Sequence, residues 1–458
     1  MFTDEELWTV MKAFFENGIA RQHIESYNRF VKNKLQEVID DIKTMELELR
    51  DRICLVKFGK IYVGEPEIVE VDGTVRKIYP NECRVRNLTY SAPLYLDITF
   101  VDGGRRKTER VHIGNLPIMV KSDYCLLSGL SEEELIAHGE DPKDPGGYFI
   151  INGSERVIVA LEDLAPNRIL VEIDRRGVLP VYRAKVFSST VGFRAGIEVN
   201  MKPPKYAIEV SIPGVPTPIP FVILMKALGV RTDREIAELV SPDPEIQDEL
   251  EPSFERAVAV RTIREAILFI GNRVAYGQVK EFRIKRAEMV IDRNLFPHLG
   301  KTPDVRRLKA IFLAEMARRV IELKLGRRGE DDKDHLKNKR VRLSGELMAE
   351  LFRLAFWSLY KDMKYQFKRM ATRKKSILVS AAVRPGIISM RMQHALATGN
   401  WKRGKVGMTQ LLDRTNTLAT LSHLRRVQSL LSRGQPNFEA RELHPTHWGK
   451  LCPNETPE

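Results

Sequence analysis

The spacing of apolar residues changes several times along this chain, and these changes limit the folds that it can adopt. Apolar side chains at three- and four-residue steps predict helices over residues 1–50 and again over 226–328. Short apolar runs broken by Gly and Pro predict strands over 53–120 and 165–225. Helical and strand-rich segments thus follow one another in blocks, which favours a mixed α+β class with more than one domain. The length of 458 residues is typical of two to four domains.

Two segments carry the clearest helical stripes. The first stripe consists of Leu308, Ile311, Phe312, Met316, Val320 and Leu323. The second consists of Met348, Phe352, Ala355, Leu359, Met363 and Phe367. A charged loop, Arg327 to Arg340, separates them. Each stripe predicts a helix that buries one face against a core.

The positive charge of the chain is concentrated in one stretch. The formal net charge is +13. Residues 361–434 contain 16 Lys or Arg and only two acids, so the rest of the chain is close to neutral. Such a concentration of like charge needs a polyanion to offset its self-repulsion. Nucleic acid is the leading candidate, and an acidic membrane surface is the alternative.

The strongest local signal lies near the carboxyl end of this basic stretch. Arginine binds phosphate oxygens two at a time, and glycine lets backbone N–H groups approach a strand closely. Leu411, Leu412, Leu418, Leu421 and Leu424 are expected to anchor the segment to a core. The candidate nucleic-acid-binding residues are Lys402, Arg403, Lys405, Gln410, Arg414, His423, Arg425, Arg426, Arg433 and Arg441.

The acidic stretch Asp331, Asp332 and Asp334 supports an alternative function. Clustered carboxylates suit a divalent cation, so a metal-dependent nuclease or phosphotransferase is a second hypothesis. The same acids alternate with Lys and Arg between residues 330 and 340, and bracing of a loop by ion pairs explains them at least as well.

Other features argue against a secreted or membrane-spanning protein. No stretch approaches the ~20 apolar residues that cross a bilayer, and the first eight residues are acidic where a secretory signal is basic. Cys54, Cys83, Cys125 and Cys452 lie far apart and form no CxxC pair, which is typical of reduced thiols. We expect a cytoplasmic protein without a disulfide framework or a metal site of its own.

Several stretches, taken together, resemble the second-largest subunit of cellular RNA polymerases (beta in bacteria). The most specific are Leu421-Ser-His-Leu-Arg-Arg426 and the terminal segment from Leu443 to Glu458. Shorter matches follow the order of the family at Arg21–Asn28, Gly147–Arg156, Asp331–His335 and Ala397–Trp401. The absence of bacterial insertions, and Trp448 where bacterial chains usually carry Tyr, make the resemblance archaeal.

The resemblance implies a domain arrangement with one domain inserted into another. It divides the chain into a protrusion (1–162 and 336–394), an inserted lobe (163–335) and a fork (395–458). Protrusion and lobe form one jaw of the DNA cleft in this family. The turns Trp401–Gly407 and Ser429–Phe438 look like the two fork loops, near the RNA–DNA hybrid and the site of downstream strand separation.

The resemblance also implies that catalysis belongs to another subunit. The Mg²⁺ of the assembled enzyme is held by aspartates of the largest subunit, so we expect this chain to be inactive alone. The chain ends inside a Glu-Thr-Pro-Glu motif after which the family continues, and a natural split or a fragment would each explain this. The implied partners are the C-terminal half of this subunit, the largest and other polymerase subunits, general transcription factors, DNA template and RNA–DNA hybrid, with no membrane.

Overall fold

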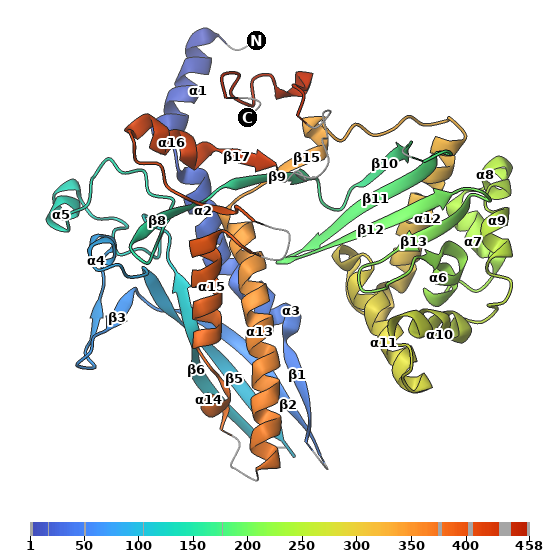
Figure 1. Ribbon diagram of the computed structural model, residues 1–458, viewed down its shortest axis with the longest axis horizontal. Coiled ribbons are helices and arrows are strands. Elements are labelled where there is room, and N and C mark those ends of the chain that lie inside the picture. The colour runs from blue at the N-terminus through green and yellow to red at the C-terminus, as the bar shows by residue number, and fades with distance from the viewer. Residues whose placement is uncertain are drawn as a thin grey trace. The chain divides into compact units, whose positions relative to one another are not determined.

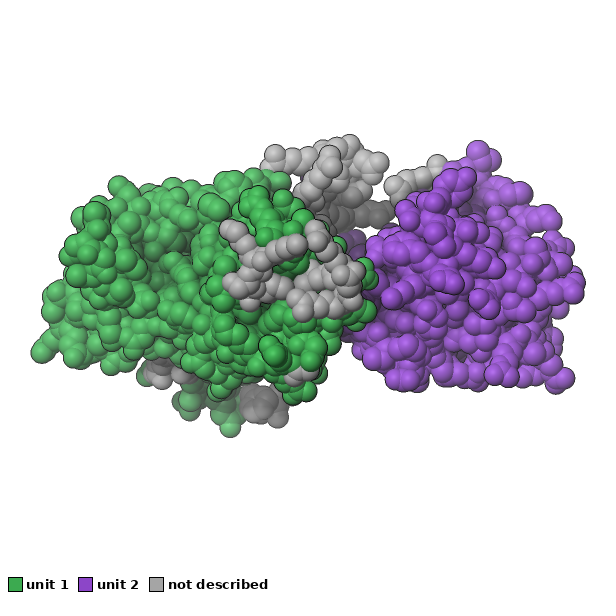
Figure 2. Space-filling view, turned by 90° about the horizontal axis from the view of Figure 1, so that it is seen from below, with its two compact units in different colours: residues 1–163, 341–434 green, residues 164–340, 435–458 purple. Residues whose placement is uncertain are grey.

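The chain folds into two compact units, each made of two segments of the sequence. The computed structural model describes residues 3–16, 18–49, 52–103, 105–175, 177–373, 378–401, 406–429 and 441–455. Unit 1 contains residues 1–163 and 341–434, and unit 2 contains 164–340 and 435–458 (Figure 2). The insertion points, Asp163/Leu164 and Arg340/Val341, lie beside the expected limits of the lobe. Residues 441–455, however, group with unit 2, whereas the resemblance assigns them to the fork.

Unit 1 is built on a four-stranded antiparallel sheet in the order β1-β2-β5-β6. These strands are Thr44–Leu49, Arg52–Val63, Ser91–Asp102 and Arg105–Pro117. The helices before the sheet are α1 (Asp4–Glu16), α2 (Arg21–Arg29) and α3 (Leu35–Ile42), with a π-helical turn at Phe30–Lys34 between the last two. Small elements follow at β3 (Glu67–Val69), β4 (Val75–Lys77), α4 (Pro80–Val85) and α5 (Glu132–Ala137).

The long helix α13 (Ser344–Thr372) covers this sheet, with α15 (Gly386–Thr398) beside it (Figure 1). Aromatic pairs mark the contact: Phe356 meets Phe58 edge-on at 5.3 Å, and Phe367 stacks on Phe100 at 5.8 Å. All six residues of the predicted second stripe are buried, so that prediction is confirmed. The short α14 (Val379–Ala382) lies against β6.

Two small sheets complete unit 1 and hold the carboxyl-terminal segment. One has the order β16-β8-β7, with strands Thr409–Leu411, Ser154–Ile158 and Phe149–Ile151. In the other, β17 (Val427–Ser429) runs parallel to β9 (Ala160–Leu164), which is also next to β15 (Lys339–Arg342). Helix α16 (Thr417–Arg425) connects β16 to β17. Strands from the middle of the chain therefore fix the position of the late, basic segment.

Unit 2 is an antiparallel five-stranded meander, β10 to β14, followed by helices (Figure 1). The strands are Ile169–Asp174, Val181–Thr190, Phe193–Lys202, Ala207–Ser211 and Ile219–Pro220. The helices are α6 (Phe221–Ala227), α7 (Asp233–Val240), α8 (Pro244–Asp248), α9 (Glu251–Glu255), α10 (Ile263–Val274), α11 (Lys280–Asn294) and α12 (Arg306–Lys324). Short 3-10 turns lie at Pro297–Leu299, Pro303–Val305, Leu336–Asn338 and Pro445–His447.

One prediction about a single element is wrong, and another is only partly correct. Residues 44–49 were expected to be helical but form β1, because Met45 and Leu47 are buried and alternate with exposed Glu46 and Glu48. Such alternation with period two is the pattern of a half-buried strand.

The second prediction concerns the first apolar stripe, which runs from Leu308 to Leu323. Leu308 and Ile311 are 54% and 46% exposed, because α12 buries the neighbouring face that carries Ala310, Leu313 and Ala317. The larger residues toward the end of the stripe, including Val320, are buried as predicted.

Mixed helices and sheets confirm the α+β class. Within the described residues, no helix combines the length and the hydrophobicity that crossing a bilayer would require.

Candidate nucleic-acid interface

The candidate residues divide between described and undescribed parts of the chain. Lys402, Arg403, Lys405 and Arg433 lie outside the described residues. Gln410, Arg414, His423, Arg425 and Arg426 belong to unit 1, and Arg441, which is exposed, belongs to unit 2. The structure brings Gln410 and His423 into contact and places the Arg425–Arg426 pair at the end of the helix that carries His423.

Strand β16 forms the base of this site. Its Gln410 pairs with Val157 of β8, and the N–H of Leu412 donates to the Glu155 carbonyl at 3.0 Å. The turn before β16 depends on Gly399, which ends α15 with a left-handed φ of 75°. A Cβ at Gly399 would lie 2.8 Å from the Thr409 carbonyl oxygen, so only glycine fits there.

Gln410 and His423 form a fixed pair. The Nδ1 of His423 accepts the Asp413 N–H at 3.1 Å, so the neutral ring carries its proton on Nε2. This Nε2 then donates to Oε1 of Gln410 at 3.0 Å. Burial, and then the positive charge of Arg426, lower the pKa of His423, which keeps the ring neutral. The side-chain amide of Gln410 is thereby held with its N–H₂ group directed away from the histidine.

Arg414 is engaged by two carboxylates of unit 1. Its Nε donates to Oε2 of Glu155 at 2.6 Å, and its Nη2 donates to Oε1 of Glu155 at 3.0 Å and to Oδ2 of Asp144 at 2.8 Å. The guanidinium also lies over the Tyr148 ring, 4.9 Å from its centre. This arrangement ties the loop after β16 to β8 and to the preceding turn. The contact of Arg414 with a phosphate that the sequence predicted is untested, and because its Nε and Nη2 are engaged here we expect Arg414 to brace unit 1 instead.

A second arginine completes this ion-pair network, which sequence reasoning did not identify. Arg84 donates to Glu155 at 2.8 Å, to Glu140 at 2.9 Å and to the Tyr148 hydroxyl at 2.8 Å. Burial raises the pKa of Glu155, but hydrogen bonds and charge from Arg414 and Arg84 outweigh it and leave that pKa below its usual range. The only sequence signal was the resemblance over Gly147–Arg156, which contains two of these residues.

The carboxyl end of α16 is held by helix α2. The buried His23 donates from Nε2 to the Leu424 carbonyl oxygen at 2.7 Å. Nδ1 of His23 is buried and has no hydrogen-bond partner among the described residues, which agrees with a neutral ring protonated on Nε2. Burial lowers the pKa of His23. Arg425, exposed, and Arg426, half-buried, follow this anchored carbonyl directly.

The expected leucine anchors are only partly correct. Leu412 and Leu424 are buried, whereas Leu411 and Leu418 are 59% and 78% exposed. Leu411 lies in strand β16 rather than in a helix, so the helical spacing read from the sequence does not apply to it. A residue outside the leucine pattern, Trp401, is fully buried and donates from its indole to the Leu347 carbonyl at 2.9 Å.

The described basic residues of the stretch 361–434 occur on several elements. Lys361, Lys368 and Arg369 lie in the second half of α13, and Arg391 lies in α15. Arg425 is the last residue of α16, and Arg426 follows it. Trp401 packs at the first turns of α13, and the 14 residues from Leu347 to Lys361 correspond to about 21 Å of helix.

The Asp331–Asp334 stretch serves the structure of unit 2. Asp331 accepts the Val171 N–H and pairs with Arg328, each at 3.0 Å. Asp332 accepts the N–H groups of Asp334 and His335, and its Oδ2 meets Nε2 of His444 at 2.9 Å. The described residues contain no group of three or more His, Cys, Asp or Glu side chains arranged to hold a metal ion. The nuclease or phosphotransferase hypothesis is not favoured.

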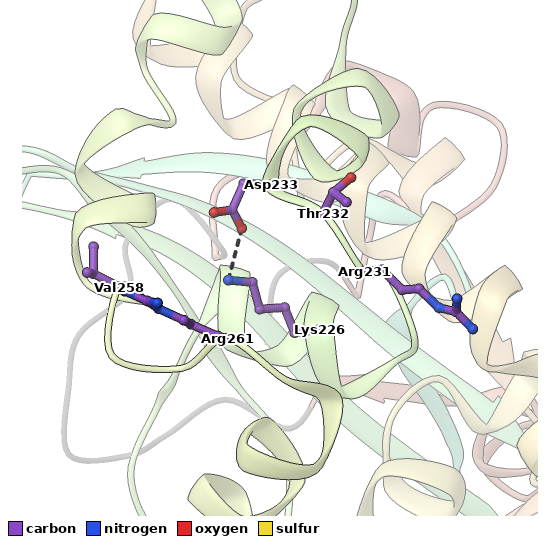
Figure 3. Close-up of a pocket in the computed structure, with 6 residues that line it drawn as sticks. All are labelled: Lys226, Arg231, Thr232, Asp233, Val258 and Arg261. Atoms are coloured by element: carbon purple, nitrogen blue, oxygen red, sulfur yellow. Dashed lines mark ion pairs between the residues drawn. The ribbon is translucent and has the colours of Figure 1, made fainter.

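A pocket of about 350 Å³ in unit 2 contains none of the candidate residues. It is lined by Lys226, Arg231, Thr232, Asp233, Val258 and Arg261 (Figure 3). The buried Lys226 pairs with Asp233 at 2.9 Å and donates to the Val260 carbonyl at 3.0 Å. In Figure 3 the two arginines extend to opposite sides of this pair, so they do not converge on a common point.

Comparison of the sequence with known protein families assigns the chain to one class of protein. The sequence profile described as RNA polymerase beta subunit matches residues 18–390, and the profile described as RNA polymerase Rpb2, domain 3, matches residues 410–458. The chain is therefore a member of the RNA polymerase beta subunit family.

Within this family the chain is similar to the archaeal subunit. It is 52% identical to the DNA-directed RNA polymerase subunit Rpo2 of Saccharolobus shibatae, over 99% of this chain and 40% of that protein. It is 50% identical to the subunit Rpo2N of Methanococcus vannielii, over 98% of this chain and 91% of that protein. The subunit Rpo2N of Methanocaldococcus jannaschii is also 50% identical, over 97% of this chain and 90% of that protein. The expected resemblance to an archaeal second-largest subunit is confirmed, and the chain spans about two-fifths of the Rpo2 relatives.

Proposed function

We propose that this chain is a nucleic-acid-positioning part of a cytoplasmic DNA-directed RNA polymerase and has no catalytic activity alone. In the assembled enzyme, Mg²⁺ held by the largest subunit would promote in-line nucleotidyl transfer. The printed names of the relatives and the family membership support the assignment to this enzyme. The ionic residues beside this site form ion pairs with one another, which suits a scaffold better than a reaction centre. They are Arg84, Glu140, Asp144, Glu155 and Arg414.

The observation that carries the proposal is the anchored end of α16. Arg425 and Arg426 follow a carbonyl that is fixed by a buried histidine. The Gln410 amide is fixed nearby through His423 of the same helix. Arginine forks on a rigid frame suit the oxygens of a sugar-phosphate backbone, and such contacts set position rather than read sequence. A helix C-terminus also favours cationic side chains, so the arginines stabilise α16 whether or not nucleic acid is bound.

In this proposal unit 1 provides the protrusion and the fork up to residue 434, and residues 164–340 of unit 2 provide the lobe. Protrusion and lobe would form one jaw of the DNA cleft. The loops near Trp401–Gly407 and Ser429–Phe438 would approach the RNA–DNA hybrid and the downstream fork. The partners would be the C-terminal half of this subunit, the largest and other subunits, and general transcription factors. Lys402, Arg403, Lys405, Arg433 and Arg441 are proposed as additional contacts to nucleic acid.

The test is the salt dependence of an assembled polymerase that carries the double substitution Arg425→Ala and Arg426→Ala. Each lost phosphate contact removes roughly one counterion from the salt slope, so we expect the slope of log K for template and hybrid to shrink by about two. The complex should also dissociate faster at moderate salt.

A matched control is available in the same unit. Arg105 and Arg106 are also adjacent and exposed, and they lie at the start of β6. Their double substitution to Ala changes the net charge equally and should leave the slope unchanged. Equal slopes for the wild-type, Arg425/Arg426 and Arg105/Arg106 enzymes would refute the proposed contact.

A further inference from the structure

We infer that His23 is a positioning residue for the nucleic-acid contact of Arg425 and Arg426, an inference that rests on the proposed function. The two sites are 401 residues apart in the sequence, yet His23 Nε2 lies 2.7 Å from the Leu424 carbonyl oxygen. The amide of Gln22 approaches the same oxygen at 3.5 Å, at the limit of a hydrogen bond. The arginines begin at the next residue.

The anchored carbonyl is one that the helix itself leaves without a partner. The last carbonyls of an α-helix have no intrahelical N–H, and a buried one needs another donor. Leu424 is fully buried, so bulk water does not reach this position readily. His23 supplies the missing donor, and its short bond fixes both the height and the direction of the final turn of α16.

His23 is itself held by a rigid joint between α2 and α13. Its backbone carbonyl accepts the Ser344 hydroxyl at 3.0 Å, and the Ser26 hydroxyl accepts the Gly345 N–H at 3.1 Å. The two helices approach so closely that a Cβ at Gly345 would lie 1.9 Å from the Ser26 carbonyl oxygen. The backbone of His23 is therefore held between two close-packed helices, which places its imidazole as a positioning role requires.

The chain continues under restraint after the arginines. Val427 starts β17 and pairs with Ala160 of β9, and the Gln428 amide donates to the Gly407 carbonyl at 3.1 Å. Arg425 and Arg426 thus lie between two fixed points, Leu424 and Val427. Without the His23 bond, the chain would lose the restraint at Leu424 and keep the one at Val427. The two arginine side chains would then change direction while the segment stays folded.

The test uses three single variants in the assembled polymerase. His23→Leu removes the donor at similar volume, and His23→Gln places an amide Nε2 close to where the imidazole Nε2 stood. We expect His23→Leu to shorten the lifetime of the template–hybrid complex about fivefold, as loss of one buried hydrogen bond allows. His23→Gln should restore it to within about twofold. His298→Leu is the control, because His298 bonds to Ser188 in unit 2 at 2.7 Å and should leave the lifetime unchanged.

The decisive measurement combines His23→Leu with Arg425→Ala and Arg426→Ala. If His23 acts through the arginines, His23→Leu shortens the lifetime no further in the background that lacks them. An equal, additive loss in that background, or a lifetime of His23→Leu like that of wild type, would overturn the positioning role. If the arginine double variant alone matches wild type, the proposed function fails instead, so the two failures are distinguishable.

Discussion

Replacement of Arg414 by Met should destabilise unit 1 without changing the salt dependence of nucleic-acid binding. The guanidinium makes three N–H···O contacts with Glu155 and Asp144, between 2.6 and 3.0 Å. The arginine side chain is 39% exposed, but the two acids are only 16% and 11% exposed. Methionine keeps much of the apolar stem over Tyr148 and removes the charge, so the variant isolates the ion pairs.

The loss of stability in Arg414→Met depends on which hydrogen bonds Glu155 and Asp144 retain. Exposed ion pairs contribute less than about 1 kcal/mol, whereas a buried charge left alone costs about 3–5 kcal/mol. Glu155 keeps the Arg84 bond at 2.8 Å, and Asp144 keeps the Gly146 N–H at 2.8 Å and the Tyr148 hydroxyl at 2.9 Å. The expected loss in the free energy of unfolding is therefore intermediate, about 2 kcal/mol.

The assay is urea unfolding of the chain, with Arg234→Met as the control. Arg234 is 89% exposed and pairs with Glu238 one helical turn away, so its loss should leave the free energy of unfolding nearly unchanged. A double-mutant cycle of Arg414→Met with Glu155→Gln should give a coupling energy of about 1 kcal/mol. Unfolding of Arg414→Met like that of wild type, together with a fall of about one in the salt slope of the assembled polymerase, would show a phosphate contact in place of a bracing role.

Two further predictions concern single residues. Lys309 is fully buried, and burial lowers its pKa from 10.5 to about 8. The unfolded chain then binds more protons at this residue between these values, so Lys309 itself should add about 2 kcal/mol to the free energy of unfolding from pH 8 to pH 10. In urea titrations this contribution is the change with pH in the difference between wild type and Lys309→Met, and a difference that stays constant from pH 8 to pH 10 would contradict the assignment. Gly345→Ala should lower the free energy of unfolding by more than about 2 kcal/mol, because the new Cβ would overlap the Ser26 carbonyl. Gly386→Ala, which has space in α15, should raise it by about 0.5 kcal/mol. Equal thermal stabilities for the two variants would contradict this.

Local patterns predicted most elements, and their failures have physical causes. The stripe of α13 was predicted correctly because apolar residues recur at every third or fourth position, most of them are large, and all six are buried. The buried face of α12 was not predicted correctly. Its Ala310 and Ala317 carry little apolar surface, whereas Leu308 is more hydrophobic than either and is nevertheless exposed. The six-residue strand β1 was missed because it follows three helical segments without an intervening Gly or Pro.

The candidate site was predictable in composition but not in its internal contacts. The sequence identified Gln410, His423 and the arginine pair through charge and resemblance. It did not separate Arg414, which braces the frame, from Arg425, which is exposed at a helix end. The reason is that the partners of Arg414 come from residues more than 250 positions earlier. The role of His23 was hidden for the same reason, since its bond spans 401 residues.

Site-specific photo-crosslinking from position 425 tests the central claim most directly. A photoreactive phenylalanine analogue in place of Arg425, in a polymerase assembled on template DNA with an RNA–DNA hybrid, should crosslink to nucleic acid. The same analogue in place of Arg105, at the start of β6 in unit 1, should not. Crosslinks from position 425 to protein subunits alone, with none to DNA or RNA, would contradict a role for the α16 terminus in holding nucleic acid.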